Sequence, residues 1–145
     1  MESKSKYVLI TGATSGIGYE LAKLFAKDGH NLIIVGRDHD RLSQTEKELR
    51  TFGVEVISMA KNLFQSGDVY SLYAELTLNG ISPEILVNDA GQCYYGRFQE
   101  TDIHREIDIV NLNIISVLIL TKLFIKDRLQ KGPGKILNLS SIASK

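Results

Sequence analysis

Short apolar runs alternate with longer amphipathic stretches along the whole chain. The runs at residues 7–10, 31–35, 54–58, 85–88 and 135–139 are rich in Val, Ile and Leu. Each is too short and too β-branched for a buried helix, so these runs predict buried strands. Strand and helix alternate from one end of the chain to the other, and this order predicts a parallel sheet that is covered by helices on both faces.

The stretches between these runs carry apolar residues at helical spacing. Helices are expected at residues 17–27, 40–52 and 67–78, and a long helical stretch is expected from an N-cap at Thr101 to about residue 129. On the first three helices, the side chains expected to face the sheet are Ile17, Leu21, Leu24, Phe25, Leu42, Leu49, Val69, Leu72, Tyr73 and Leu76.

The connections between parallel strands restrict how this pattern can fold, because such crossovers are right-handed. With the switch point beside the glycine-rich turn after the first strand, they predict the strand order 3-2-1-4-5 of a Rossmann-like, doubly wound sheet. No repeat, low-complexity segment or linker divides the sequence, so residues 1–145 are expected to form one α/β domain.

The glycine-rich turn has the sequence TGATSGIG and opens the first expected helix. Gly12 allows a tight turn, Gly16 lets main-chain amides reach a pyrophosphate, and Gly18 lets the helix pack against the strand. The helix N-terminus then faces the anion. A merely tight turn would be the alternative, but a position between strand and helix is the one that dinucleotide binding requires.

The spacing Gly-x-x-x-Gly-x-Gly resembles that of the short-chain dehydrogenase/reductase family, and three further motifs agree. The sequence NDAG at residues 88–91 is similar to the family's Asn-Asn-Ala-Gly signature at the end of the fourth strand. Asn113 lies where the family carries a catalytic-site asparagine, and ILNLSSIAS resembles the fifth strand with its catalytic serine. The motifs occur in the family's order over nearly the whole chain, so the resemblance implies an NAD(P)-binding Rossmann domain.

The resemblance also implies which residues contact the cofactor: Gly12, Thr14, Ser15, Gly16, Ile17, Gly18, Arg37, Asn62, Leu63, Asn88, Ala90 and Gly91. Arg37 stands where the family's NAD-specific members carry Asp. A guanidinium suits the additional phosphate of NADP by its charge and its fork of donors, so NADP is favoured over NAD. Two alternatives stay open: Arg37 could be a solvated loop residue, and Asp38 could draw it aside or face the ribose itself.

Two residues depart from the family's pattern near this site. Asn62 replaces an aspartate that usually meets the adenine amino group, although its carbonyl oxygen can accept the same bond. Asp89 replaces the second asparagine of the signature and lacks the donors of an amide. Whatever those donors hold in the family must therefore be held otherwise in this chain.

In the family, hydride moves between the nicotinamide and a carbonyl/alcohol pair, while a tyrosine beside a lysine handles the proton. The resemblance makes Ser141 the serine that orients the substrate and Asn113 the residue that holds a water in the proton path. Ser140 would line the cofactor side. A polar strand end that caps the next turn is the alternative for both serines.

The family's tyrosine–lysine pair is expected beyond Ser141, but the sequence closes at Lys145. Tyr19 and Lys23 have the spacing Tyr-x-x-x-Lys, yet they lie on the first helix and predict ordinary surface contacts. Tyr94 and Tyr95 lie in the loop that shapes the family's substrate pocket, and we expect them to contact substrate or to pack.

We therefore expect the amino-terminal portion of a longer oxidoreductase, truncated after the fifth strand and inactive by itself. Its substrate would be a small carbonyl compound or alcohol, and the resemblance allows a homo-oligomer through the fourth helix. The alternative is a catalytically inactive nucleotide-binding module.

The composition excludes other classes of protein. Seventeen basic and seventeen acidic residues cancel, so neither nucleic acid nor membrane is an expected partner. The apolar run at residues 114–120 is too short to span a bilayer, and the apolar run near the start of the chain is too short for the core of a signal peptide. Cys93 is the only cysteine, so no disulfide within the chain is possible. These features favour a cytoplasmic protein. His30, His39 and His104 have no companions at ligand spacing, so no metal site is expected.

Overall fold

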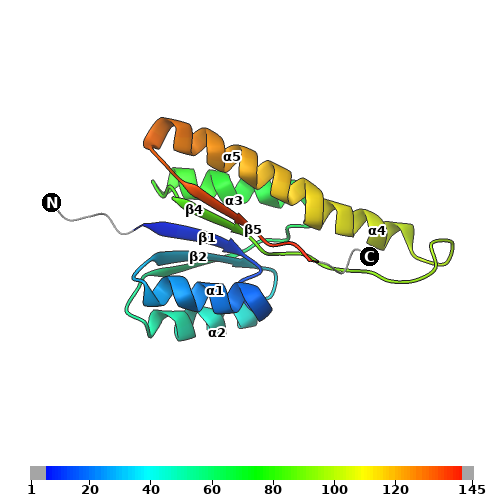
Figure 1. Cartoon of the computed structure of the whole chain (residues 1–145), viewed down its shortest axis with the longest axis horizontal. Helices are drawn as coiled ribbons and strands as arrows, with labels where there is room; N and C mark the ends of the chain where they lie inside the picture. Colours follow the sequence, from blue (N-terminus) through cyan, green and yellow to red (C-terminus); the bar gives the residue numbers. More distant parts are fainter. Residues whose placement is uncertain (1–5, 142–145) are drawn as a thin grey trace.

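The computed structural model describes residues 6–141 as a five-stranded parallel sheet with helices on both faces (Figure 1). The strands are β1 (Tyr7–Thr11), β2 (Asn31–Gly36), β3 (Val56–Ala60), β4 (Ile85–Asn88) and β5 (Lys135–Asn138). Their order in the sheet is β3-β2-β1-β4-β5, which confirms the predicted order. Residues 1–5 and 142–145, which the predicted domain includes, lie outside the described residues.

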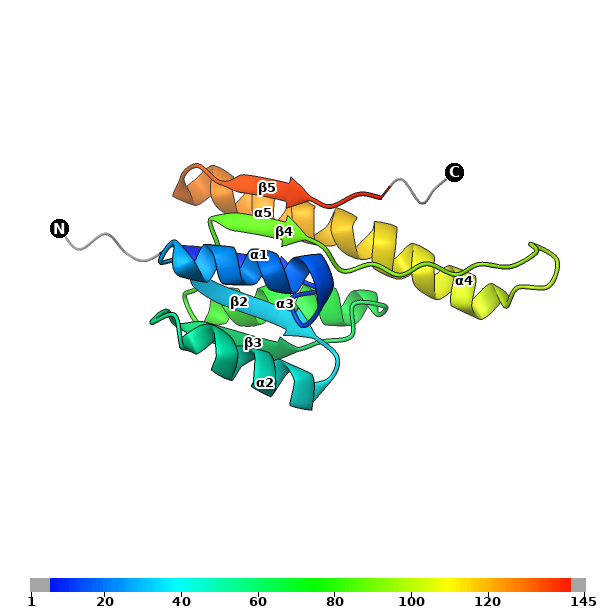
Figure 2. The ribbon, with the colours of Figure 1, turned by 60° about the horizontal axis from the view of Figure 1, so that its bottom comes forward.

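The helices form one layer on each face of the sheet. Helices α1 (Gly16–Lys27) and α2 (His39–Arg50) cover one face, and α3 (Ser66–Leu78) and α5 (Ser116–Lys131) cover the other (Figure 2). Helix α4 (Ile103–Val110) continues through one π-helical turn, η1 (Asn111–Ile115), into α5. This continuous helix confirms the long helical stretch, and its α4 end extends past the carboxyl edge of the sheet (Figure 1).

Alternate residues of the central strands enter two separate cores. The core beneath α1 and α2 takes Val8, Ile10, Leu32, Ile34 and Val87. The core beneath α3 and α5 takes Leu9, Ile33, Val35 and Leu86, together with Phe124 of α5. Burial on both faces explains why these strands are continuously apolar, since each buried Leu, Ile or Phe stabilises the fold by roughly 1.5–3 kcal/mol.

The face of α1 that meets the sheet differs from the predicted one. Ile17 and Leu24 are 64% and 57% exposed, while Leu21 and Phe25 are partly buried at the margin of the core. The helix turns its smallest residues inward instead: Gly18, Ala22 and Ala26. These small side chains let the α1 backbone approach the strands more closely than branched side chains would.

Several predicted boundaries also differ from the observed ones by one or two residues, and those of α4 and β3 are examples. The N-cap of α4 is Asp102 rather than Thr101, and the Asp102 carboxylate accepts a hydrogen bond from the His104 N–H at 2.9 Å. Strand β3 begins at Val56 rather than at residue 54. Before it, the Glu55 N–H is bound by the side-chain oxygen of Asn31 at 3.0 Å.

The apolar run at residues 114–120 lies inside the long helix that α4, η1 and α5 form. The helix Ile103–Lys131 has 29 residues and, between residues 6 and 141, is the one helix long and apolar enough to cross a membrane. The expectation that this run is too short for a bilayer is therefore wrong by length and composition. Leu120 and Phe124 are nevertheless buried against the sheet, and a core helix passes the same test.

Strand β5 forms one edge of the sheet and is exposed along its length. Ile136 is 38% and Leu137 41% exposed.

Candidate functional site

Two adjoining clefts open at the carboxyl edge of the sheet. The first, the turn cleft, has a volume of about 400 Å³ and includes these predicted cofactor residues: Gly12, Thr14, Ser15, Gly16, Ile17, Arg37, Leu63, Ala90 and Gly91. The second, the serine cleft, has about 490 Å³ and includes Asn88, Asn113, Ser140 and Ser141. Both are lined by Ile17 and by residues 89–92, so a ligand that fills one cleft borders the other. Volumes of this size are typical of small-molecule sites.

The glycine turn is shaped by close contact with the end of β4. Gly12 has a φ of +69°, and a Cβ placed on it would lie 2.7 Å from the Asp89 Oδ2 and 2.9 Å from the Ala90 nitrogen. A Cβ on Gly18 would lie 2.2 Å from the Gly12 oxygen and 2.3 Å from the same Asp89 oxygen. Gly18 lies beneath the turn and outside the lining of both clefts. Gly18 is thus closely packed, but its closest contacts are with the main chain of the turn and with Asp89 just after β4, rather than with the strand itself.

The Asp89 carboxylate lies close to the first turn of α1. The N-cap residue Ser15 makes no side-chain capping bond within the described chain, whereas the Asp89 carboxylate accepts one from the Gly18 N–H. Burial raises the pKa of Asp89, and the Gly18 N–H offsets this only in part. Because Gly18 is satisfied from beneath, the main-chain amides of Gly16 and Ile17 at the helix N-terminus stay available to an anion in the turn cleft.

The main chain after β4 is held by the Thr11 hydroxyl. The Thr11 Oγ1 accepts hydrogen bonds from the Asp89 N–H at 3.1 Å and from the Ala90 N–H at 3.0 Å. The same hydroxyl donates to the Val87 carbonyl at 3.4 Å. Thr11 thus ties the glycine turn to the β4 loop.

Arg37 lies at the wall of the turn cleft and stacks on an aromatic ring. Its guanidinium carbon is 4.6 Å from the centroid of Phe64. Asp38 caps α2, because its Oδ1 accepts from the Asp40 N–H at 2.9 Å and from the Arg41 N–H at 3.1 Å. The Asp38 carboxylate is therefore engaged by α2, and Phe64 orients Arg37.

Two other polar residues follow β3. Lys61 lines the turn cleft, but its ammonium is bound by Glu75 at 2.5 Å and by Ser71 at 2.6 Å. Its charge is therefore largely offset by α3. Asn62 lies outside both clefts and lines a neighbouring cavity, and its Oδ1 accepts a hydrogen bond from the Phe64 N–H at 3.1 Å. The part of Asn62 that was expected to meet adenine thus already holds one local bond.

Asn113 lies in the π-helical turn and is held by the loop after β4. Its Nδ2 donates to the Gln92 carbonyl at 2.8 Å, and the Gln92 N–H donates to its Oδ1 at 3.0 Å. At the end of the same π-helical turn, the Ser116 hydroxyl donates a hydrogen bond to the Leu112 carbonyl at 2.5 Å. Both ends of the Asn113 amide are thus engaged at the rim of the serine cleft.

The two serines after β5 reach the same cleft as Asn113. Asn88 fixes the neighbouring strand ends, because its Nδ2 donates to the Asn138 side chain at 2.8 Å and to the Thr121 hydroxyl at 3.3 Å. Ser140 and Ser141 follow and are exposed. The structure thus brings the predicted catalytic residues Asn113 and Ser141 into one lining, next to the turn cleft.

The Tyr-x-x-x-Lys sequence on α1 makes surface contacts, as predicted. The Tyr19 hydroxyl donates to Glu48, and the Lys23 ammonium lies 4.9 Å from the Tyr19 ring centroid. The bond to Glu48 raises the pKa of Tyr19, and burial adds to this. A proton-transferring tyrosine needs the opposite shift.

Tyr94 and Tyr95 lie outside the lining of both clefts. The Tyr94 hydroxyl accepts from the Asp102 N–H at 3.1 Å, and its ring carries the Arg105 guanidinium at 4.1 Å. Tyr95 is 72% exposed. Tyr94 therefore packs against the start of α4, which is one of the two roles expected of it.

Comparison with known proteins agrees with this geometry. The sequence signature of the family described as short chain dehydrogenase matches residues 6–145. A very-long-chain 3-oxoacyl-CoA reductase of Mycosarcoma maydis is 32% identical over 146 residues, which cover 97% of this chain and 41% of that protein. The chain spans about half the length of the curated relatives it matches.

Two solved structures have nearly the same fold. A short-chain dehydrogenase from Sphingobium yanoikuyae in complex with NADPH is 33% identical, with a TM-score of 0.87, over 94% of this chain and 54% of that one. The bulky-bulky ketone specific alcohol dehydrogenase from Comamonas testosteroni is 32% identical, with a TM-score of 0.88, over 97% of this chain and 56% of that one. With the signature matched over nearly its whole length, this chain belongs to the short-chain dehydrogenase family.

Proposed function

We propose that the whole protein is an NADP(H)-dependent oxidoreductase that interconverts a carbonyl group and an alcohol. The observation that carries this proposal is the contact between the two clefts, which share Ile17 and residues 89–92. One cleft offers helix amides and Arg37 to a phosphorylated dinucleotide. The other offers Ser141 and Asn113 to a substrate next to it.

The residues of the turn cleft fit a phosphorylated nicotinamide dinucleotide. The close-packed Gly12 and Gly18 leave the amides of Gly16 and Ile17 for a pyrophosphate, and Arg37 offers a guanidinium to a further phosphate. When bound, the dinucleotide supplies or accepts the hydride. Relatives in complex with NADPH or NADP support this choice of cofactor.

In the serine cleft, the Ser141 hydroxyl would hold the substrate oxygen, and Asn113 would position a water. Neither side chain has a pKa suited to delivering a proton near neutral pH. We therefore propose that the proton comes from a Tyr-x-x-x-Lys pair in the whole protein. The matched relatives are about twice as long as this chain, which leaves room for such a pair.

The test is turnover by the full-length protein. We expect NADPH oxidation with a panel of ketones, and we expect Ser141→Ala to lower kcat by about 100-fold, as the loss of one positioned donor does. Ser43→Ala, an exposed serine on α2, is the matched control and should leave kcat unchanged. If the protein binds NADPH but converts no carbonyl compound or alcohol, it is a nucleotide-binding module instead. If Ser141→Ala keeps full activity, the assignment of the serine cleft is wrong.

We further propose a cytoplasmic homo-oligomer that pairs through the long helix. Its outward face carries an apolar stripe in which every member is at least 42% exposed: Ile103, Ile107, Val110, Ile114, Leu118, Ile125 and Leu129. Exposed apolar surface of this extent usually marks an interface. Sedimentation should find a dimer or larger species that Leu118→Glu dissociates. A wild-type monomer would refute pairing, and co-flotation with lipid vesicles would refute the cytoplasmic assignment.

A further inference from the structure

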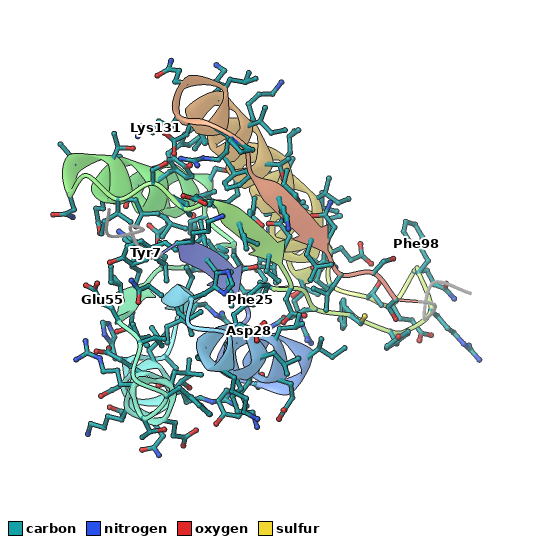
Figure 3. All side chains as sticks on the ribbon, turned by 60° about the vertical axis from the view of Figure 1, so that its left-hand side comes forward. Tyr7, Phe25, Asp28, Glu55, Phe98 and Lys131 are labelled. Carbon is teal, nitrogen blue, oxygen red and sulfur yellow. The ribbon has the colours of Figure 1, made fainter. Side chains whose placement is uncertain are left out.

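A third cavity, the arginine cavity, adjoins the turn cleft and has a volume of about 230 Å³. It shares Arg37, Phe64 and Gln92 with the turn cleft, so a ligand in the turn cleft can extend into it. Its opposite wall comes from the first turns of α4, through Arg105 and Asp108. This wall lies beyond the sheet edge, where α4 and the loop with Phe98 at its tip project from the body of the fold (Figure 3).

Arg105 is fixed in place in the same way as Arg37. Its guanidinium carbon lies 4.1 Å from the centroid of the Tyr94 ring, and Tyr94 is itself bound to the Asp102 N–H at the start of α4. Arg37 stacks on Phe64 at 4.6 Å. Two arginines from different elements therefore line one cavity, and an aromatic ring orients the guanidinium group of each.

Within the described part of the chain, neither arginine is neutralised by a close ion pair. The ion pairs within residues 6–141 involve neither Arg37 nor Arg105 at 4.0 Å or less. Asp108 is the one carboxylate among the described lining residues, so two positive charges face one negative charge there. The cavity therefore favours a ligand with a phosphate that a planar fork of donors can bind.

We propose that Arg105 is a second specificity-determining residue for the phosphorylated cofactor, binding the phosphate on the adenosine from the side opposite Arg37. The inference rests on the proposed function. It adds a residue of α4 to the choice between NADP and NAD, which the sequence analysis assigns to Arg37 alone. Binding of the phosphate by two guanidinium groups makes recognition depend on α4 as well as on the sheet.

The test is a titration of NADPH and of NADH at one fixed salt concentration, because the contact is electrostatic. Arg105→Ala should weaken NADPH binding about tenfold, which corresponds to the loss of one charge-assisted contact, and should leave NADH binding unchanged. Arg97→Ala is the matched control, since it removes an exposed charge from the adjoining loop and should change neither affinity. Arg105→Lys keeps the charge and should retain part of the preference.

The outcomes separate this inference from the proposed function. Equal weakening of NADPH and NADH by Arg105→Ala would mean that Arg105 only supports the fold of the loop, and the inference would be wrong. Wild-type affinities in Arg105→Ala, alongside a lost preference in Arg37→Ala, would overturn the inference and leave the proposed function standing. If the wild-type protein binds neither dinucleotide, both fail.

Discussion

Gly18 is the most closely packed glycine of the site, and the structure allows the loss of stability on its replacement by Ala to be estimated. In Gly18→Ala, the new Cβ would lie 2.2 Å from the Gly12 carbonyl oxygen, whereas an ordinary carbon–oxygen contact is about 3.3 Å. The turn or the helix must therefore move by about 1 Å. Overpacking of this kind costs about 1–3 kcal/mol, and a displaced Asp89 would lose its bond to the Gly18 N–H for about 1 kcal/mol more. Together these terms predict a loss of roughly 2–4 kcal/mol of unfolding free energy.

Gly67→Ala is the matched control for this substitution. Gly67 lies in the first turn of α3, and a Cβ on it would meet no atom within 4 Å. The higher helix propensity of Ala should leave stability unchanged or raise it by up to about 1 kcal/mol. Urea unfolding followed by circular dichroism measures both variants against wild type. A Gly18→Ala variant as stable as wild type, or an equal loss in both variants, would refute the close packing of the turn.

The remaining predictions concern two carboxylates whose contributions to stability depend on pH in opposite directions. Burial raises the pKa of Asp89, so its contribution is present in acid and lost as the pH rises through the raised value; Asp89→Asn should therefore raise the melting temperature at neutral pH, and the gain should vanish in acid. Asp127 accepts from Tyr73 at 3.0 Å and from Ser82 at 2.5 Å, and pairs with Lys131 at 2.8 Å. Burial raises the pKa of Asp127, but these partners outweigh it and hold the pKa below its ordinary value, so the contribution is lost as the pH falls. Asp127→Asn should cost about 1–3 kcal/mol at neutral pH and less in acid, and melting curves with the same pH trend for both variants would contradict this account.

The sheet order could be predicted from the sequence because crossover handedness and the glycine turn leave few alternatives. The inward face of α1 could not be predicted from the sequence, because Ile17 and Leu24 have the helical spacing of residues that face a core. Helical spacing does not reveal that the strands lie close enough to require small side chains such as Ala22. The N-cap of α4 was missed because Thr101 and Asp102 are adjacent and both can cap a helix.

The residues that line the two clefts could be predicted from the family's motifs, but the side chains and main-chain groups that bind them could not. From the sequence, Asp89 only lacks the amide donors of the asparagine that it replaces. The fold shows that its carboxylate lies against Gly18. The stacking of Arg37 on Phe64, and the capture of Asn113 by Gln92, join segments far apart in the sequence. The π-helical turn that carries Asn113 has no signal in the apolar pattern.

The central claim is that a phosphorylated dinucleotide binds across the glycine turn and beside the serine cleft. The most direct measurement is amide NMR of the isotope-labelled protein during titration with NADPH. We predict shifts at the Gly12–Gly18 turn, at Arg37, at residues 61–64 and at the β4 loop with Gln92, and weaker changes with NADH. Unperturbed turn amides at saturating NADPH, or shifts confined to the exposed stripe of the long helix, would contradict the account.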